Sequence, residues 1–386
     1  MFDFDEVIRR EGTSCIKYDA RKEVFGRDDI LPMWVADMDF KSPPCVIEAA
    51  KKLCNHGVFG YTFRPESSIE AFMRWVTERY NWTIKREWIT SSPGVVSALP
   101  LALRCLTNPG DKVLIQTPVY PPFHSVVKES GRELVCSPLI QGREHYFVDW
   151  EDFEIKLKSG VKMFVLCNSH NPLGKVWSRE ELMKMGELCL KYGVKIFSDE
   201  IHADLALFGN KHTVMASVSE DISSVTITAM APSKTFNIPG MLNSVIVIQS
   251  KKMFECFRHE LTSMHLDLGN IFGHITMDAA YRHGGVWLAH LKQYLEKNID
   301  YSYEYILNNI PSVNLLKPQG SFLLWLDFRK SGYSHEEVRD RLLNIAGLGL
   351  NDGTGFGADG RGFFRMNIGA PISVVKEGLE RLKKAF

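Results

Sequence analysis

The stretch that decides the fold is residues 231–240, which read APSKTFNIPG. Its only lysine, Lys234, is enclosed by small residues, proline and glycine, and it follows the β-rich run VTITA at 225–229. We therefore expect Lys234 to lie just beyond the end of a buried strand. Burial disfavours the charged ammonium group, so an amine placed there can act as a nucleophile or a base. Taken alone, the pattern also describes an ordinary solvated lysine in a polar turn.

Two further polar segments each follow an apolar run that predicts a buried strand. The segment NSHNPLG at 168–174 comes directly after VKMFVLC at 161–167, and DEIH at 199–202 comes after VKIFS at 194–198. Ligands of open α/β sheets bind beyond the carboxyl ends of the parallel strands. An amide, an acid and a lysine at three such ends would therefore converge on one small aromatic ligand.

The order of these motifs resembles that of the fold-type I enzymes that use pyridoxal 5′-phosphate (PLP), the aminotransferase class I/II superfamily. The string LPMWVADMDF at 31–40, together with DEIH and SKTFNIPG, is similar to the bacterial carbon–sulfur lyase branch, which contains cystathionine β-lyases and cysteine desulfhydrases. The resemblance extends from about residue 28 to the final helix. It implies an α/β protein of PLP fold type I (aspartate aminotransferase-like), with a mainly parallel sheet in a large domain and a smaller α+β domain.

The composition argues against several classes of function. The 46 basic and 46 acidic residues balance, so the chain carries no electrostatic footprint for nucleic acid and no polybasic patch for a membrane surface. No apolar run approaches the ~20 residues of a membrane helix, and the acidic N-terminus shows no signal peptide. Eight scattered cysteines without a C-x-x-C pair favour reduced thiols over disulfides or a metal site. We therefore expect a cytoplasmic protein without a bound metal.

Helical and strand patterns alternate through the middle of the chain. Strands are expected near 112–116, 133–138, 161–167, 194–198, 225–229 and 244–249. Helices are expected at 95–106, after a capping box SSIE at 67–70, and after SREE at 178–181. Later elements are a helix at 286–309, a strand at 322–326, a helix near 335–345, a glycine-rich loop at 351–362, a strand at 363–368 and a helix from 373. The patterns predict a large domain at 45–285 and a small domain at 286–386, to which the resemblance adds 1–44.

The resemblance also assigns roles around the cofactor. PLP needs a Schiff-base lysine, a partner for its pyridine nitrogen, a face to stack on and an anion site for its phosphate. Lys234 would be the lysine, and Asp199 would face the pyridine nitrogen and keep it protonated. Asn171 would donate to the phenolic oxygen O3′, and the ring of Tyr120 would stack on the cofactor. His202 stands where many aminotransferases of this fold have a tyrosine, and a histidine there is similar to the lyase branch. Each of these residue types also has an ordinary structural use, as an N-cap, a turn former, a core tyrosine or a buried histidine.

The phosphate is expected at the N-terminus of the predicted helix 95–106. Backbone N–H groups of Gly94, Val95 and Val96 would bind it, and Ser233 would add a hydroxyl. A turn before a helix is common, so this signal depends on the other motifs.

Four more positions shape the expected site. Ala231 and Leu242 depart from the aminotransferase pattern, which often has serine and arginine there, so the phosphate pocket should carry less positive charge. Tyr61 resembles the tyrosine that reaches the phosphate of the neighbouring subunit, which implies a homodimer with shared active sites. Arg365 resembles the residue that holds the substrate α-carboxylate, because guanidinium geometry suits a two-pronged contact. A surface arginine on a strand flank is its alternative interpretation.

The resemblance implies a PLP-dependent carbon–sulfur β-lyase with a sulfur amino acid as its small-molecule substrate. We expect α,β-elimination from L-cystathionine or L-cysteine to pyruvate, ammonia and a thiol, which is homocysteine or hydrogen sulfide. An amino acid aminotransferase is the first alternative, because both reactions begin with the same removal of the Cα proton. A non-catalytic ligand-sensing module is the second.

Overall fold

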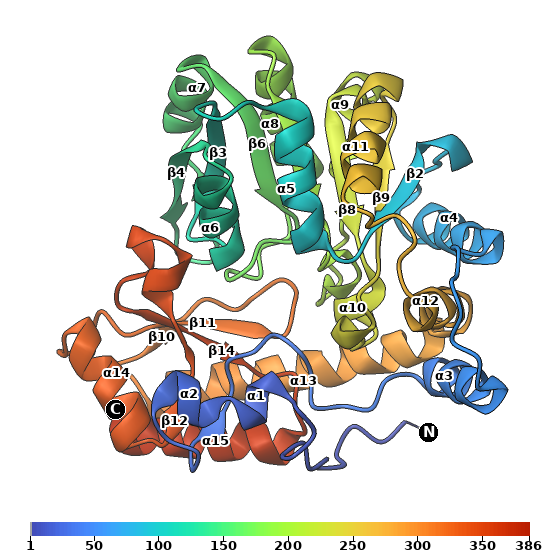
Figure 1. The fold of residues 1–386 in the computed structure, drawn as a ribbon. Coiled ribbons are helices and arrows are strands. Elements are labelled where there is room, and N and C mark those ends of the chain that lie inside the picture. The colour runs from blue at the N-terminus through green and yellow to red at the C-terminus, as the bar shows by residue number, and fades with distance from the viewer. Residues whose placement is uncertain (1) are drawn as a thin grey trace.

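The computed structural model describes residues 2–386 and is built around an eight-stranded sheet (Figure 1). The strand order is β2-β9-β8-β7-β6-β3-β4-β5, and β4, β3, β6, β7 and β8 run parallel. Strands β9, β2 and β5 pair antiparallel at the two sides. The mainly parallel sheet expected from the sequence is therefore present. The bounds of its strands are β2 (Ile89–Ser92), β3 (Lys112–Thr117), β4 (Glu133–Gln141), β5 (Tyr146–Val148), β6 (Val161–Cys167), β7 (Lys195–Asp199), β8 (Thr226–Met230) and β9 (Ser244–Ile248).

Helices cover both faces of this sheet, which explains why its strands are almost continuously apolar. Successive side chains of a strand point to opposite faces, so Met163 and Val165 join one core cluster whereas Phe164 and Leu166 join another. The first cluster contains residues of α5 (Val95–Leu106), α6 (Pro121–Glu129) and α11 (Lys251–Ser263), which lie in front of the sheet in Figure 1. The second contains residues of α7 (Trp150–Lys158), α8 (Arg179–Lys191) and α9 (Glu220–Ser224).

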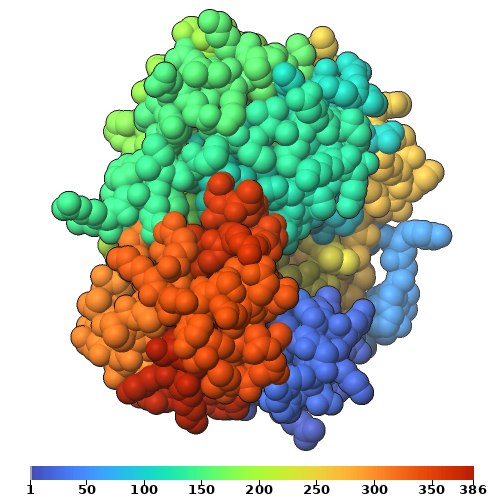
Figure 2. Space-filling model, turned by 90° about the vertical axis from the view of Figure 1, so that its left-hand side faces the viewer, coloured from blue at the N-terminus to red at the C-terminus, as the bar shows by residue number. Residues whose placement is uncertain are grey.

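A second, antiparallel sheet is formed by later residues in the order β10-β11-β14-β13. The N-terminal residues join this part of the chain, because β1 pairs in parallel with β12. Figure 2 shows the N-terminal and C-terminal residues side by side. We propose that 1–44 and 286–386 form the small domain and 45–285 the large one. The elements of this part are α1 (Ile16–Asp19), α2 (Arg21–Phe25), β1 (Leu31–Pro32), α13 (Gly285–Asn309), β10 (Asn314–Leu315), β11 (Leu323–Asp327), α14 (His335–Asn344), β12 (Leu348–Gly349), β13 (Asn351–Asp352), β14 (Phe363–Asn367) and α15 (Ile372–Ala385).

Local predictions were confirmed in some places and wrong in others. The helix at 95–106 and the capping box of Ser178 with Glu181 are both present. The capping box at 67–70 was wrong, because α4 (Glu66–Tyr80) already begins after Pro65. The hydroxyl of Ser68 lies within the first turn and donates to the Pro65 carbonyl at 2.9 Å. The predicted loop at 351–362 contains β13 and two short 3-10 turns.

The remaining helices are α3 (Pro44–His56), α12 (Ile271–His283) and the one-turn α10 (Pro232–Thr235). Helix α12 packs against both α3 and α4. No helix within residues 2–386 is both long and apolar enough to cross a membrane.

Candidate active site

A cavity of about 220 Å³ lies at the carboxyl ends of β6, β7 and β8. The strand register brings these ends level, because Cys167 pairs with Asp199 and Asp199 pairs with Ala229. The motifs that follow the three strands therefore meet at one place, as the strand-end rule predicts. Predicted site residues that line the cavity are Gly94, Val95, Val96, Tyr120, Asn171, Asp199, His202, Ser233 and Lys234.

Lys234 occupies the short helix α10, directly beyond β8. Its amine donates a hydrogen bond to the carbonyl oxygen of Ala36, a residue 198 positions earlier. Burial lowers the pKa of Lys234 to about 8, and the Arg365 charge acts in the same direction. A lysine with this pKa is partly unprotonated near neutral pH, which is the state that reacts with an aldehyde or accepts a proton.

Asp199 ends β7 and is almost completely buried. Burial raises the pKa of this carboxyl to about 7, although the N–H group of Ile201 donates to Oδ1 at 3.0 Å. A carboxylate in such surroundings needs a cationic or proton-donating partner to stay ionised. A pyridine nitrogen would be such a partner.

His202 is also buried, and burial lowers its pKa to about 3. The ring is therefore neutral, and its Nδ1 lies 3.3 Å from the hydroxyl of Ser321. Because Ser321 is close in sequence to β11, this contact links the cavity to the second sheet. Tyr120 is tied to the same site, because its N–H group donates to the Asn171 carbonyl at 3.1 Å.

Arg365 lies in β14 and is 4% exposed, so it is not a surface arginine. Its guanidinium donates to Asn171 Oδ1 and to the Trp34 carbonyl, each at 3.0 Å, and also to Asn351. Burial lowers its pKa to about 10, which still leaves it charged at neutral pH. No carboxylate within residues 2–386 forms an ion pair with it. Since a buried charge without a counter-ion is costly, a substrate carboxylate would stabilise this group.

The other end of the cavity is suited to an anion. Gly94 is the N-cap of α5, and no side chain caps this helix terminus, so its first N–H groups remain available. Within the described chain, Lys234 is the only lysine or arginine that lines the cavity, in agreement with the departure at Leu242. Sequence reasoning missed Arg64, which donates to Asn243, a residue that lines the cavity, and, at 2.9 Å, to the Ser244 carbonyl.

Tyr61 does not line the cavity of its own chain. Its side chain is fully exposed and borders a neighbouring surface hollow together with Phe59, Leu268 and Leu242. Leu242 also lines the main cavity, so the hollow and the cavity are adjacent.

The model of the aminotransferase class I and II family matches residues 28–382. The chain belongs to this family. Within the family, the chain is 44% identical to cystathionine β-lyase PatB of Bacillus subtilis, with 100% of both chains covered. It is 30% identical to protein MalY of Escherichia coli, with 100% of this chain and 99% of MalY covered. Cystalysin of Treponema denticola, whose structure contains PLP, has a TM-score of 0.96 and 34% identity, with 100% of this chain and 98% of that chain covered. A PLP-bound structure from Clostridium difficile 630, provisionally named an aminotransferase, has a TM-score of 0.98 and 43% identity over 100% of both chains.

These relationships and the site identify the protein as a PLP-dependent carbon–sulfur lyase. The residues present fit the cofactor. Lys234 offers an amine of lowered pKa, and Asp199 is a buried carboxyl that lacks a cationic hydrogen-bond partner within the described chain. The open N-terminus of α5 offers N–H groups to a phosphate.

Proposed function

We propose that this lyase cleaves the Cβ–S bond of L-cystathionine and of L-cysteine-type substrates. Cystathionine and water would give homocysteine, pyruvate and ammonia, and cysteine would give hydrogen sulfide in place of homocysteine. The observation that carries this proposal is the position of Arg365, a buried cation without an internal carboxylate, joined through Asn171 to the cavity that Lys234 lines. The likeness to cystathionine β-lyase PatB supports the choice of substrate.

Arg365 would hold the substrate α-carboxylate. Three of its N–H groups are engaged by protein acceptors, which leaves two donors for a ligand. Because Asn171 Oδ1 accepts from Arg365, the amide nitrogen of Asn171 is the group left to donate toward O3′ of the cofactor. The amino acid would therefore be oriented by the same pair of residues that contacts the cofactor.

Lys234 would accept the Cα proton on its amine. Bound PLP supplies an aromatic ring that takes up the electron pair released at Cα. Asp199 would keep the pyridine nitrogen protonated, and the neutral His202 would contact the cofactor without adding charge. A thiolate then leaves from Cβ. Since thiolates are good leaving groups, the step needs little help from a general acid.

An amino acid aminotransferase is the second candidate, favoured by the name of the Clostridium difficile structure. The two activities separate in one experiment, in which the purified enzyme is incubated with L-cystathionine and no keto acid. Release of pyruvate supports elimination, and strict dependence on a keto acid supports transamination. Since the relatives are enzymes and Lys234 is present, we do not retain the ligand-sensing interpretation.

We also propose that the enzyme is a homodimer in which Tyr61 reaches the partner's cavity. The apolar side chains of Val58, Phe59 and Phe63 are all more than half exposed next to Tyr61. Such a patch beside a cavity is typical of a protein interface. Phe63→Asp should produce monomers in sedimentation experiments, and Tyr61→Phe should weaken PLP binding in dimers that stay intact. A stable monomer that binds PLP tightly would contradict this proposal.

The eight cysteines are scattered and include no C-x-x-C pair, a pattern typical of reduced thiols. We therefore propose a cytoplasmic location, which fractionation of cells that express the protein would test.

A further inference from the structure

The segment 34–40, which reads WVADMDF and is here termed the strap, contacts two functional side chains of the site, Lys234 and Arg365, through its backbone. The carbonyl of Ala36 accepts a hydrogen bond from the Lys234 amine, and the carbonyl of Trp34 accepts one from Arg365 at 3.0 Å. The strap therefore helps to fix the position of the Lys234 amine relative to the Arg365 guanidinium.

Two asparagines from distant parts of the chain hold the strap. Asn367 of β14 donates to the carbonyls of Val35 and Asp37. Asn237, three residues after Lys234, accepts from the Met38 N–H group at 2.9 Å and donates to the Met38 carbonyl at 2.8 Å. Both asparagines bind only backbone atoms of the strap.

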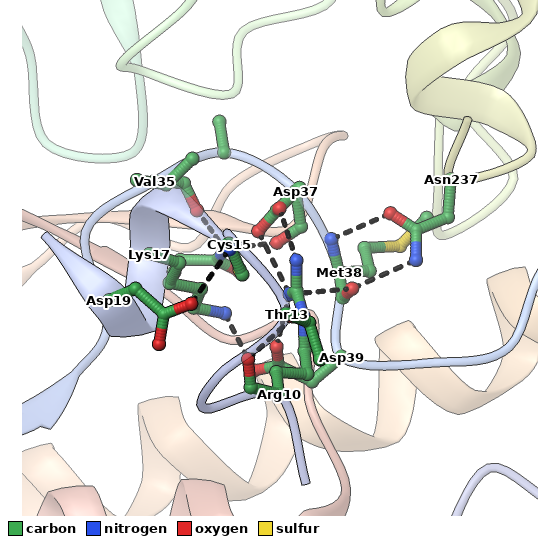
Figure 3. Close-up of polar contacts among 12 residues, drawn as sticks. Arg10, Thr13, Cys15, Lys17, Asp19, Val35, Asp37, Met38, Asp39 and Asn237 are labelled. Carbon is green, nitrogen blue, oxygen red and sulfur yellow. Dashed lines mark hydrogen bonds and ion pairs between the residues drawn. The ribbon is translucent and has the colours of Figure 1, made fainter. Parts of the chain in front are cut away.

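The two acidic side chains of the strap, Asp37 and Asp39, contact Arg10 and Lys17 from the N-terminal part of the chain (Figure 3). Arg10 donates to Asp37 and to Asp39, each at 2.6 Å, and Lys17 donates to the other oxygen of Asp39 at 2.6 Å. Lys17 is 1% exposed and Asp39 is 4% exposed. We call these four residues the charge cluster. Its two positive and two negative charges balance, so none is left uncompensated.

Arg10 is the member that joins both acids. Although the strap bends at residues 35–37 and 39–40, one planar guanidinium spans the carboxylates of Asp37 and Asp39. This geometry fixes the direction of the strap as well as its place. Ion pairs that are buried or partly buried contribute little net stability compared with apolar packing, and in some proteins they select one arrangement over others.

We propose that Arg10 is a positioning residue of this lyase, which by gripping Asp37 and Asp39 holds the Ala36 carbonyl where it orients the free amine of Lys234. Lys234 can donate to Ala36 only while its amine is free. When the amine is engaged elsewhere, the strap loses this hydrogen bond and depends more on the charge cluster. Arg10 thereby keeps the acceptor in place for each return of the amine.

The charges around Lys234 provide a readout that a purely structural role would not change. Arg365 from β14 opposes the protonated amine, whereas Asp37 from the strap and Asp199 from β7 favour it. His202 remains neutral. Arg10 compensates the charge of Asp37, so its removal should raise the pKa of Lys234. Removal of the Asp37 charge should lower it.

The experiment compares Arg10→Gln, Arg10→Lys and Asp37→Asn with Arg9→Gln in the PLP-loaded enzyme. Arg9 is the matched control, because it is adjacent to Arg10 in sequence but its side chain is 85% exposed. Its ion pair is with Glu11, outside the strap, at a longer distance of 3.6 Å. The first readout is hydrogen exchange of the strap amides of Met38 and Asp39, which donate to Asn237 Oδ1 and to the Gly369 carbonyl. The second is the pH midpoint at which the visible absorbance of the bound cofactor changes, which reports the proton on the cofactor-linked nitrogen of Lys234 and responds to the same neighbouring charges.

We expect Arg10→Gln to speed exchange of both amides by at least about tenfold, with partial recovery in Arg10→Lys and less than about twofold change in Arg9→Gln. From the Coulomb interaction, the pH midpoint should rise in Arg10→Gln and fall in Asp37→Asn, each by about a few tenths of a pH unit. Unchanged exchange in Arg10→Gln, or midpoints that move in the same direction in both variants, would overturn the proposal. Thermal unfolding checks the fold of each variant; if Arg10→Gln does not fold, Arg10→Lys is compared with Arg9→Gln, and equal amide exchange in these two overturns the proposal.

The role of Arg10 rests on the proposed function only in that Lys234 is taken as the reacting amine. The two fail separately. If cystathionine yields no pyruvate but the two midpoints move in opposite directions, the substrate assignment falls and the positioning role stands. If pyruvate forms but Arg10→Gln leaves amide exchange in the strap unchanged, the substrate assignment stands and the positioning role of Arg10 falls.

Discussion

Replacing Arg365 by lysine tests the substrate assignment most directly. The arginine is buried, makes three hydrogen bonds to protein acceptors and leaves two donors for a carboxylate. A lysine keeps the charge but loses the fork. A hydrogen bond to a charged group contributes about 1.5–3 kcal/mol, so the loss of one such bond to the substrate corresponds to about 10- to 100-fold in kcat/KM.

This loss should appear mainly in KM. The carboxylate is held equally before and during removal of the Cα proton, and an interaction of that kind changes KM rather than kcat. The assay is pyruvate release from L-cystathionine, with the visible absorbance of the enzyme as a check that PLP remains bound. We expect kcat to fall by less than about fivefold, because Asn171 loses one of its partners.

A substrate analogue supplies the control. A thioether amine that lacks the α-carboxylate should bind to the wild-type enzyme and to Arg365→Lys with the same affinity, within about twofold. If the variant discriminates against this analogue as strongly as against cystathionine, Arg365 acts through the architecture of the site and not through the carboxylate. An unchanged KM for cystathionine would refute the reasoning outright.

Three further predictions concern the large domain. Borohydride treatment of the PLP-loaded enzyme followed by peptide mapping should label Lys234 alone, and Lys234→Ala should abolish the label; a label at any other lysine would contradict the site. The pKa of Asp199 is raised by burial from 3.8 to about 7 in the PLP-free protein, so its contribution to stability is complete below about pH 4 and is lost as pH rises through 7. Urea unfolding of PLP-free wild type should therefore lose up to about 4 kcal/mol relative to Asp199→Asn over that range, and parallel pH profiles would exclude this. Asp204 accepts hydrogen bonds from Trp75 at 3.0 Å, from Tyr80 at 2.5 Å and from Thr235 at 2.8 Å. Asp204→Ala should therefore lower the free energy of unfolding by about 3 kcal/mol, and Thr235→Val, which removes one of these bonds, by about 1 kcal/mol. Equal losses in the two variants would argue against a shared acceptor.

The sequence predicted the strand-end part of the site because that part obeys a local rule. Asn171, Asp199 and Lys234 each follow an apolar run, and parallel strands in matching register deliver whatever follows them to one edge. Arg365 came from the family resemblance, since a residue inside an antiparallel strand carries no such signal. Its burial was revealed only by the structure, which packs β14 against the strap.

The contacts that the sequence did not reveal all join segments far apart in the chain. The hydrogen bond of Ala36 with Lys234 spans 198 positions, and no periodicity in either segment points to the other. Arg64 was missed for the same reason, because its partners Asn243 and Ser244 are about 180 positions away. The capping box at 67–70 failed for a local reason, since the helix begins at Glu66 with Pro65 as its N-cap, which places both serines inside the first turn.

The long-range contacts couple two tasks that the sequence motifs assign separately. Arg365 binds the Trp34 carbonyl and Lys234 binds the Ala36 carbonyl, so the groups for the substrate carboxylate and for the Cα proton are attached to the same strap two residues apart. A carboxylate that draws the guanidinium toward itself would also pull on the strap. Arg10 binds both acids of that strap, so the strap is not a free loop. The group that binds the α-carboxylate and the amine that accepts the Cα proton therefore share one backbone segment as their common support.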